Sequence, residues 1–123
     1  MTREWEYPQL SGTGYVDDDN GMYQLITSAE NVDCSCWLDT MMVSITEPAE
    51  GGTAGVIRFQ FGNGDGWFEL PAHTAGVTPF DFGENGQLVC PFNSDGLQMI
   101  STNASTKQAK AWVTFMGHRK LQQ

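Results

Sequence analysis

Basic residues are scarce in this sequence. Its 123 residues include 6 Lys and Arg against 15 Asp and Glu, for a formal net charge of −9. A body this acidic repels phosphate backbones, so nucleic acid is a poor candidate partner. All of the acidic residues lie at or before Asp95. The charged residues of the segment 107–123 are all basic, namely Lys107, Lys110, Arg119 and Lys120. This basic end is expected to be a solvated tail or to pair with an acidic surface, including that of a second copy.

Long apolar runs are also absent. No run approaches the roughly 18 residues that a membrane-spanning helix needs, so we expect no membrane partner. The start of the chain, MTREWEYPQL, does not have the basic segment followed by an apolar one that marks a secretory signal peptide. We therefore expect synthesis in a cytoplasm without export by that route. Hydrophobic residues still make up 40% of the chain, which is enough for one folded domain with its own core.

Cysteine is rare, and the number of cysteines is odd. The chain has three cysteines, Cys34, Cys36 and Cys90, and an odd count does not describe a disulfide framework. A zinc site needs about four thiolate or imidazole ligands, and neither His73 nor His118 has ligand spacing to the cysteines. The expectation is three free structural thiols that pack as small apolar side chains, with no metal site.

Signatures of catalysis and of cofactor binding are missing. The chain has no G-x-S-x-G and no H-E-x-x-H motif. In FGNGDGWF, residues 61–68, no lysine follows the glycines, so a hairpin turn is expected rather than a phosphate-binding loop. The acidic stretch VDDDNG, residues 16–21, does not fit the spacing of an EF-hand; it predicts a charged bend, with a looser calcium site as the alternative. We expect no catalytic residue, no cofactor and no enzymatic activity.

Alternation of apolar and polar residues dominates the rest of the chain. In residues 56–61, VIRFQF, every second side chain is apolar, and residues 109–115 alternate in the same way. This period of two is typical of a half-buried strand. Residues 37–46 form a third apolar stretch that includes Leu38, Met42 and Ile45. Further strands are expected near Met22–Thr27, Trp67–Leu70, Thr78–Phe82, Gln87–Cys90 and Leu97–Thr102.

Turn dipeptides separate these strands. Asn-Gly or Asp-Gly pairs begin at residues 20, 63, 65, 85 and 95, and such pairs supply the positive φ angles of tight turns. Short strands at this spacing are typical of a sandwich or barrel. No segment combines an N-cap residue, an apolar face with a period of 3.6 residues and a C-terminal stop signal, so helices are not expected. We predict an all-β, single-domain antiparallel β-sandwich, of which the jelly roll is one form, with little helix. Its expected parts are an extended N-terminal arm at 1–10, the sandwich at 11–117 and a basic C-terminal tail at 118–123.

Aromatic residues are the candidate contact residues. Trp112 occupies the polar phase of the last strand, so either its ring lies in a packed contact or both faces of its sheet are partly buried in the sandwich. Trp67 and Phe68 are adjacent in a strand and are expected to point to opposite faces. The predicted protein-interaction residues are Trp5, Tyr7, Trp67 and Trp112, with Arg119 and Lys120 supplying charge complementarity.

The stretch Thr78–Gly117, TPFDFGENGQLVCPFNSDGLQMISTNASTKQAKAWVTFMG, resembles the ends of small β-sandwich virion proteins of tailed bacteriophages. The shared order is a PFDFG-like strand, a Gly-led strand, a polar turn and a GLQM-ST strand. A hairpin rich in Ser, Thr and Ala then precedes a final amphipathic strand that ends in glycine. The resemblance covers about a third of the chain.

This resemblance implies a non-enzymatic virion structural protein. The expected role is that of a capsid decoration (cement) protein, which stabilises the head by binding the major capsid protein, or other virion proteins, and sister copies. The resemblance also implies a homo-oligomer, with a trimer favoured, that is made in the host cytoplasm and located in the virion. The alternatives are a head–tail or tail accessory protein and a carbohydrate-binding adhesion module, in which exposed rings stack on sugars.

Overall fold

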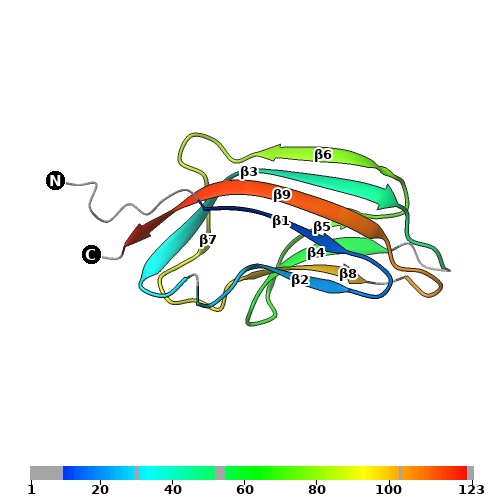
Figure 1. The fold of residues 1–123 in the computed structure, drawn as a ribbon, viewed down its shortest axis with the longest axis horizontal. Helices are drawn as coiled ribbons and strands as arrows, with labels where there is room; N and C mark the ends of the chain where they lie inside the picture. Colours follow the sequence, from blue (N-terminus) through cyan, green and yellow to red (C-terminus); the bar gives the residue numbers. More distant parts are fainter. Residues whose placement is uncertain (1–9, 30, 52–54, 103, 122–123) are drawn as a thin grey trace.

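The strands occupy most of the chain (Figure 1). The computed structural model describes residues 10–29, 31–51, 55–102 and 104–121. Within these ranges there is no helix, so none that is long and apolar enough to cross a membrane. The strands are β1 (Leu10–Val16), β2 (Met22–Ile26), β3 (Cys34–Glu47), β4 (Val56–Phe61), β5 (Gly66–Pro71), β6 (Gly76–Asp81), β7 (Gln87–Cys90), β8 (Leu97–Thr102) and β9 (Lys110–Leu121).

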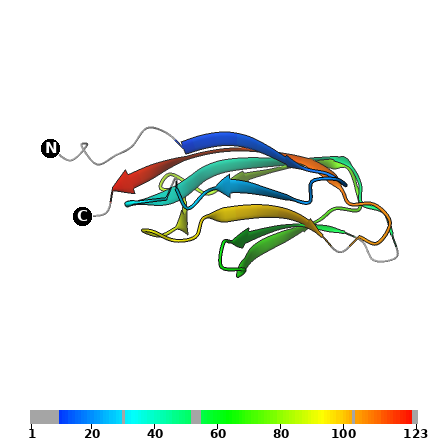
Figure 2. The ribbon, with the colours of Figure 1, turned by 60° about the horizontal axis from the view of Figure 1, so that its bottom comes forward.

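The strands form two sheets that pack face to face (Figure 2). The first sheet has the order β1-β9-β3-β6, with β7 also paired to β3, and the second has the order β2-β8-β4-β5. The pairs β1–β9, β2–β8, β3–β6 and β4–β5 are antiparallel. Along the chain each pair lies between the two strands of the pair before it, and successive pairs alternate between the two sheets. That connectivity is the jelly roll. The prediction of an all-β, single-domain antiparallel sandwich is confirmed.

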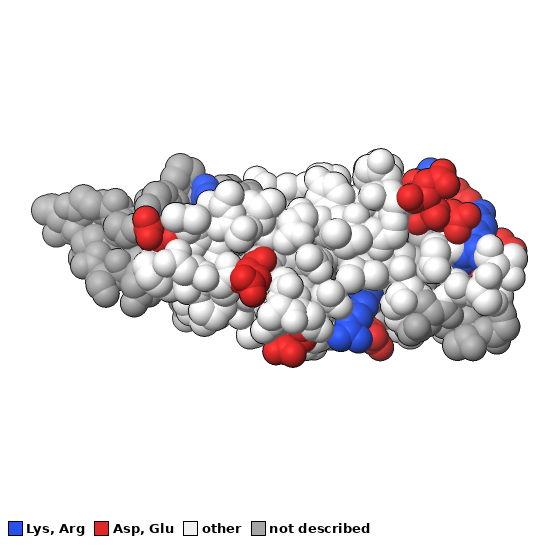
Figure 3. Space-filling view, turned by 90° about the horizontal axis from the view of Figure 1, so that it is seen from below, with Lys and Arg blue, Asp and Glu red and all other residues white. Residues whose placement is uncertain are grey.

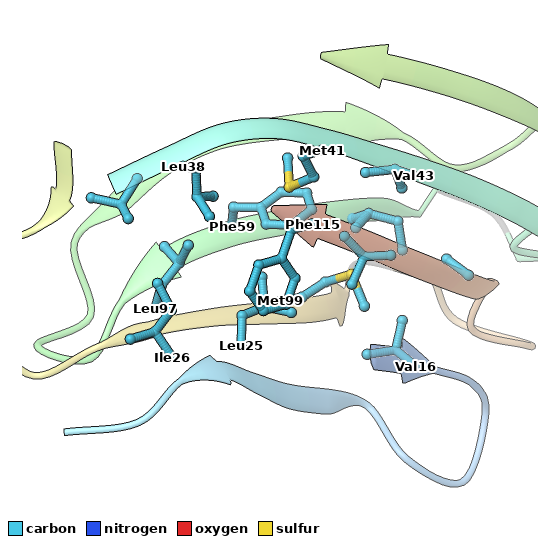
Figure 4. Close-up of a cluster of buried hydrophobic side chains, with 14 of the residues drawn as sticks. Val16, Leu25, Ile26, Leu38, Met41, Val43, Phe59, Leu97, Met99 and Phe115 are labelled. Atoms are coloured by element: carbon cyan, nitrogen blue, oxygen red, sulfur yellow. The ribbon is translucent and has the colours of Figure 1, made fainter. Parts of the chain in front are cut away.

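The core lies between the two sheets (Figure 4). Because side chains alternate along a strand, each strand contributes every second residue to it. From the first sheet come Leu38, Val43 and Phe115, and from the second come Phe59 and Met99, all of them buried. Burying a side chain of this size stabilises the fold by roughly 1.5–3 kcal/mol relative to leaving it in water.

A β-bulge in β3 changes which side chains enter the core. Opposite β9, Leu38 pairs with Gly117 and Thr40 pairs with Met116, so Asp39 is the extra residue. Up to the bulge the buried residues are even-numbered, and beyond it they are odd-numbered: Cys34, Cys36 and Leu38, then Met41, Val43 and Ile45. Met42, from the apolar stretch at 37–46, therefore points away from the core and is 50% exposed.

The Gly-rich stretch that begins at Phe61 is the hairpin turn between β4 and β5, as predicted. The Phe61 N–H donates to the Asp65 carbonyl at 2.8 Å, and the Asn63 side-chain oxygen accepts from the Asp65 N–H at 2.9 Å. The acidic bend after β1 is closed similarly, because the Asp17 carboxylate accepts from the N–H groups of Asp19 and Asn20. Among the described residues, no group of His, Cys, Asp and Glu is placed to hold a metal ion.

Charged side chains gather at one end of the molecule, at the right of Figure 3. The connections β1–β2, β3–β4 and β8–β9 meet there (Figure 1). Lys107 Nζ lies 2.7 Å from Glu47 Oε1, and the Gln108 N–H donates to the Asp18 carboxylate at 3.0 Å. These contacts tie the β8–β9 connection to the end of β3 and to the β1–β2 bend.

The Lys107–Glu47 pair predicts a small, pH-dependent stabilisation. The hydrogen bond and charge of Lys107 lower the pKa of Glu47, so this contribution disappears as pH falls through the lowered value. The same contact raises the pKa of Lys107, so the contribution also disappears as pH rises through the raised value. A double-mutant cycle of Glu47→Gln and Lys107→Gln, measured by urea unfolding, should show coupling at about pH 7 and none at about pH 2. Equal coupling at both would contradict the ion pair, because an uncharged carboxyl cannot form it.

The three cysteines lie together at the opposite end of the core from the charged loops. Cys36 and Cys90 are cross-strand partners of β3 and β7, and all three cysteines are buried and form no disulfide. Burial, reinforced by the neighbouring thiols Cys34 and Cys90, raises the pKa of Cys36 to about 12. Since the thiolate is the reactive form, the native Cys36 thiol should be inert.

The burial of the thiols predicts a large difference in reactivity between the native and unfolded protein. With dithionitrobenzoate at about pH 8, we expect negligible release of thionitrobenzoate from the native protein and three equivalents in denaturant. Rapid labelling of the native protein at a rate independent of its stability would contradict the buried placement.

Candidate interaction surface

The outer face of the first sheet carries an ordered array of side chains, which we call the outer grid. Strand register and alternation place these residues in three rungs that run across β1, β9, β3 and β6. The first rung is Tyr15, Trp112, Ser44 and Val77; the middle rung is Thr13, Thr114, Met42 and Pro79; the last rung is Ser11, Met116, Thr40 and Asp81.

The outer grid is almost free of charge. Of its residues only Asp81 carries a charge at neutral pH, although the whole chain has a net charge of −9. Asp81 lies on β6, which is the edge strand, so the centre of the grid holds only apolar and small hydroxyl side chains. Copies of an acidic protein repel one another, and an uncharged face is where that repulsion opposes contact least.

A ridge of rings crosses the first rung. The rings of Tyr15 and Trp112 are 5.1 Å apart between centroids and tilted by 33°. Trp112 is 41% exposed, so its sheet face is an outer surface of this chain and not the interior of the sandwich. Of the two readings of Trp112 that the sequence left open, burial inside one sandwich is therefore excluded. Large exposed rings on an uncharged face are typical of contact surfaces.

A groove of about 500 Å³ lies beside this ridge. Its walls come from the middle and last rungs, and its floor from β3, β6 and β9: Thr40, Met41, Met42, Pro79, Phe80, Asp81, Thr114, Phe115 and Met116. Met42 and Met116 are both exposed. Methionine is unbranched and polarisable, so these walls can adapt to a ring inserted between them.

The outer face of the second sheet differs in that its polar groups bind one another. Gln60 donates to Gln98, and Gln98 donates to Gln24, each at 3.1 Å, across three neighbouring strands. Arg58 and Glu69 form an ion pair at 3.5 Å on the same face. Covering this face would dehydrate the Arg58–Glu69 pair, whereas the outer grid carries one charged side chain, Asp81, at its edge.

Trp67, a predicted contact residue, lies elsewhere. The register of the β4–β5 pair shifts between Phe59 and Gln60, so Trp67 is an extra residue in β5, at a β-bulge. The expectation that Trp67 and Phe68 point to opposite faces is therefore wrong. Their rings meet edge to face at 4.7 Å, and Trp67 also packs 5.5 Å from Phe82. Together with Phe80, the rings of Trp67, Phe68 and Phe82 pack in the space between β5 and β6.

Arg119 and Lys120 belong to β9, which continues to Leu121. Lys120 Nζ lies 5.7 Å from the centroid of the Trp37 ring, a cation–π contact. Arg119 pairs with Cys36 in the register of β3 and β9, and its charge acts on the Cys36 thiol. At about 3.3 Å per residue, Lys120 is about 26 Å from Trp112 along the strand.

The structure therefore does not bring the predicted contact residues into one site. Trp112 is in the outer grid, Trp67 closes the sandwich, and the basic pair lies at the far end of β9. Trp5 and Tyr7 lie outside the described residues. Sequence reasoning missed Tyr15, Met42 and Met116 as neighbours of Trp112, because their proximity depends on which strands pair.

No protein-family model matches the chain, and no curated protein matches it. A virus-like particle of the extra small virus of the giant freshwater prawn, Macrobrachium rosenbergii, solved by cryo-EM, has a similar chain at a TM-score of 0.38 and 9% identity, over 95% of this chain and 82% of that one. A chain of infectious bursal disease virus, Gt strain, is similar at a TM-score of 0.23 and 13% identity, over 97% of this chain and 31% of that one. The assignment of the jelly roll rests on strand order and not on these similarities.

Proposed function

We propose that this chain is a non-enzymatic structural protein of a virus particle, and specifically a capsid decoration protein. In this role it binds the major capsid protein and sister copies and stabilises the head. Two features support the proposal by analogy: the jelly roll is an architecture of viral capsid domains, and Thr78–Gly117 resembles virion proteins of tailed bacteriophages.

The observation that carries the proposal is the outer grid. It combines exposed Trp112, Tyr15, Met42 and Met116 with a near absence of charge on an otherwise acidic molecule. Covering such a face stabilises an assembly by roughly 25 cal/mol for each Å² of apolar surface, before the costs of association. Many weak contacts of this kind on a particle surface would oppose its disassembly.

Particles made with and without this protein provide the test. We expect the chain in purified particles by mass spectrometry, and we expect particles that lack it to release their genome at a lower temperature. Adding the purified protein back should restore the original release temperature. Purified particles that never contain the chain would contradict the proposal.

The location on the particle separates two structural roles. A decoration protein should label the whole head with antibody-bound gold in electron micrographs. A head–tail or tail accessory protein should label one vertex or the tail instead, which would retain the virion assignment and reject the decoration role.

One hollow favours a carbohydrate-binding module as the second candidate function. A pocket of about 360 Å³ lies between the β4–β5 turn and the β7–β8 connection, with Phe61 beside polar side chains that include Asn63, Asn93, Ser94 and Asp95. A ring beside carboxylate and amide groups can stack on a sugar and orient its hydroxyls. On a glycan array this reading predicts saturable binding that Asp95→Ala abolishes, and an array without any signal would reject it.

A further inference from the structure

We propose that the outer grid is covered by the outer grid of a second copy of this chain, in a two-fold, face-to-face pair. The proposal deepens the function proposed above and rests on it in one respect, namely that the chain works by surface contact. The occupant is inferred from the shape of the face, from its charge and from its area.

The shape of the outer grid is self-complementary. The Tyr15–Trp112 ridge stands on the first rung, and the groove beside Met42 and Met116 lies between the middle and last rungs. Rungs are about 7 Å apart, so ridge and groove are displaced by about 10 Å on one face. A two-fold axis that lies in the plane of contact, halfway between them and perpendicular to the line joining them, exchanges the two. Each ridge then enters the groove of the other copy, and both contacts form at once.

The chemistry of the two features also matches. The groove of about 500 Å³ is lined mainly by apolar atoms of methionine, proline and threonine side chains and has room for an indole and a phenol ring. Methionine sulfur makes favourable contacts with aromatic rings. The one carboxylate of the grid, Asp81, borders the groove from β6, an edge strand of the sheet, so it lies toward the rim of the pair where water still reaches it.

Charge favours a second copy over an oppositely charged partner. A basic partner would gain most from the acidic loops at the end of the molecule, not from a face without charge. Two copies that each carry −9 can approach only where neither presents acids. The outer grid meets that condition over β1, β9 and β3, and its one acid, Asp81, lies on β6.

The area of the grid sets the expected strength. Four strands about 4.8 Å apart and three rungs cover about 400 Å² per copy, so the pair buries about 800 Å² or somewhat more. This is below the roughly 1,200 Å² at which standard specific interfaces begin, so we expect a weak dimer that forms at high protein concentration. Copies held side by side on a particle have a high effective concentration, so a contact of this strength suffices there.

The two-fold symmetry of this contact argues for pairs. Each copy uses the same surface, so the contact is satisfied by one partner, yields dimers and does not by itself build the trimer that the resemblance implies. A heterologous contact, in which the ridge and the groove of one copy meet two different neighbours, would instead give rings or filaments that grow with concentration.

Sedimentation velocity of the whole chain over a range of concentrations tests the pair. We expect the wild-type protein to pass from monomer to dimer, with no larger species. Trp112→Ala removes the ridge and Met42→Glu blocks the groove, and each should weaken the dimer at least about 30-fold. Phe92→Ala and Met22→Glu are matched controls, because these residues are similarly exposed and lie off the outer grid. They should leave the dimer unchanged.

Mixing the two variants identifies the occupant. An equimolar mixture of Trp112→Ala and Met42→Glu should dimerise more strongly than either variant alone and less strongly than the wild type, because one of the two ridge–groove contacts can form again. Circular dichroism checks that both variants fold, and Thr114→Glu replaces Met42→Glu if that variant does not. A wild-type protein that stays monomeric at millimolar concentration, or a mixture that does not recover, would overturn the pair. A monomeric chain that is nevertheless found in particles would reject only the pair and retain the virion role.

Discussion

Replacing Gly117 by alanine is expected to destabilise the fold by about 3 kcal/mol or more. Gly117 is buried in β9 opposite Leu38, where the bulge brings the two backbones together. A Cβ at this position would lie 1.9 Å from the carbonyl oxygen of Trp37. That oxygen belongs to the backbone, so it cannot rotate away, and the central β3–β9 pair has to open. Because whole domains are stable by only about 5–15 kcal/mol, urea unfolding followed by circular dichroism should show a much lower midpoint.

Gly76→Ala is the matched control for this prediction. Gly76 is also a strand glycine of the first sheet, but an added Cβ would meet no atom within 4 Å. Its stability should change by less than about 0.5 kcal/mol. Equal effects of the two substitutions would indicate a general cost of losing glycine in a strand and would reject the close approach at Gly117.

Replacing Asn31 by alanine is expected to cost about 3 kcal/mol. Asn31 is fully buried beside the three thiols. Its amide donates to the carbonyl of Cys34 at 2.7 Å and to that of Cys90 at 3.4 Å, and its oxygen accepts from the Ser94 hydroxyl at 2.7 Å. One side chain therefore joins the start of β3, the end of β7 and the β7–β8 connection. Alanine would leave these buried polar groups without this partner and would also leave a void.

Two further substitutions separate hydrogen bonding from packing at Asn31. Ser94→Ala removes only one of the bonds and should cost about 1 kcal/mol. Asn31→Asp keeps the shape but buries a carboxyl whose pKa burial raises, so its loss of stability relative to the wild type should be smallest at acid pH and grow as pH rises. A difference in urea midpoint between Asn31→Asp and the wild type that does not depend on pH would contradict the buried, hydrogen-bonded placement.

Local patterns in the sequence predicted several strands to the residue. β4, β7 and β8 have the predicted bounds, because each is a short run rich in apolar residues, closed by glycine, proline or polar turn residues on both sides. β3 was predicted from residue 37 but begins at Cys34. Its first three residues are cysteine and serine, which do not indicate a strand as clearly as β-branched or aromatic residues do. β9 was predicted only to residue 115 and continues into the basic segment, where Leu121 still pairs with Cys34.

The bulges were the features that sequence reasoning could not find. Asp39 shifts the phase of β3, and Trp67 is the extra residue of β5, so both reverse the faces that simple alternation assigns. Gly117 and Gly86 make the first of these possible by leaving room beside the backbone of Leu38 and the carboxylate of Asp39. In the sequence these glycines look like any others, because the atoms that they accommodate come from a distant strand.

The sequence by itself determined that this protein is built of short, amphipathic strands joined by tight turns, because side-chain alternation and positive-φ dipeptides act within a few residues. It also placed Trp112 on the face of its strand opposite that of Ala111 and Val113, whereas the exposure of its ring was decided by the structure. Only the tertiary structure decided that Tyr15, Trp112, Met42 and Met116 share one uncharged face, since that depends on β1 and β3 both pairing with β9. Strand order is set by burial summed over the whole chain, and no local stretch of residues encodes it.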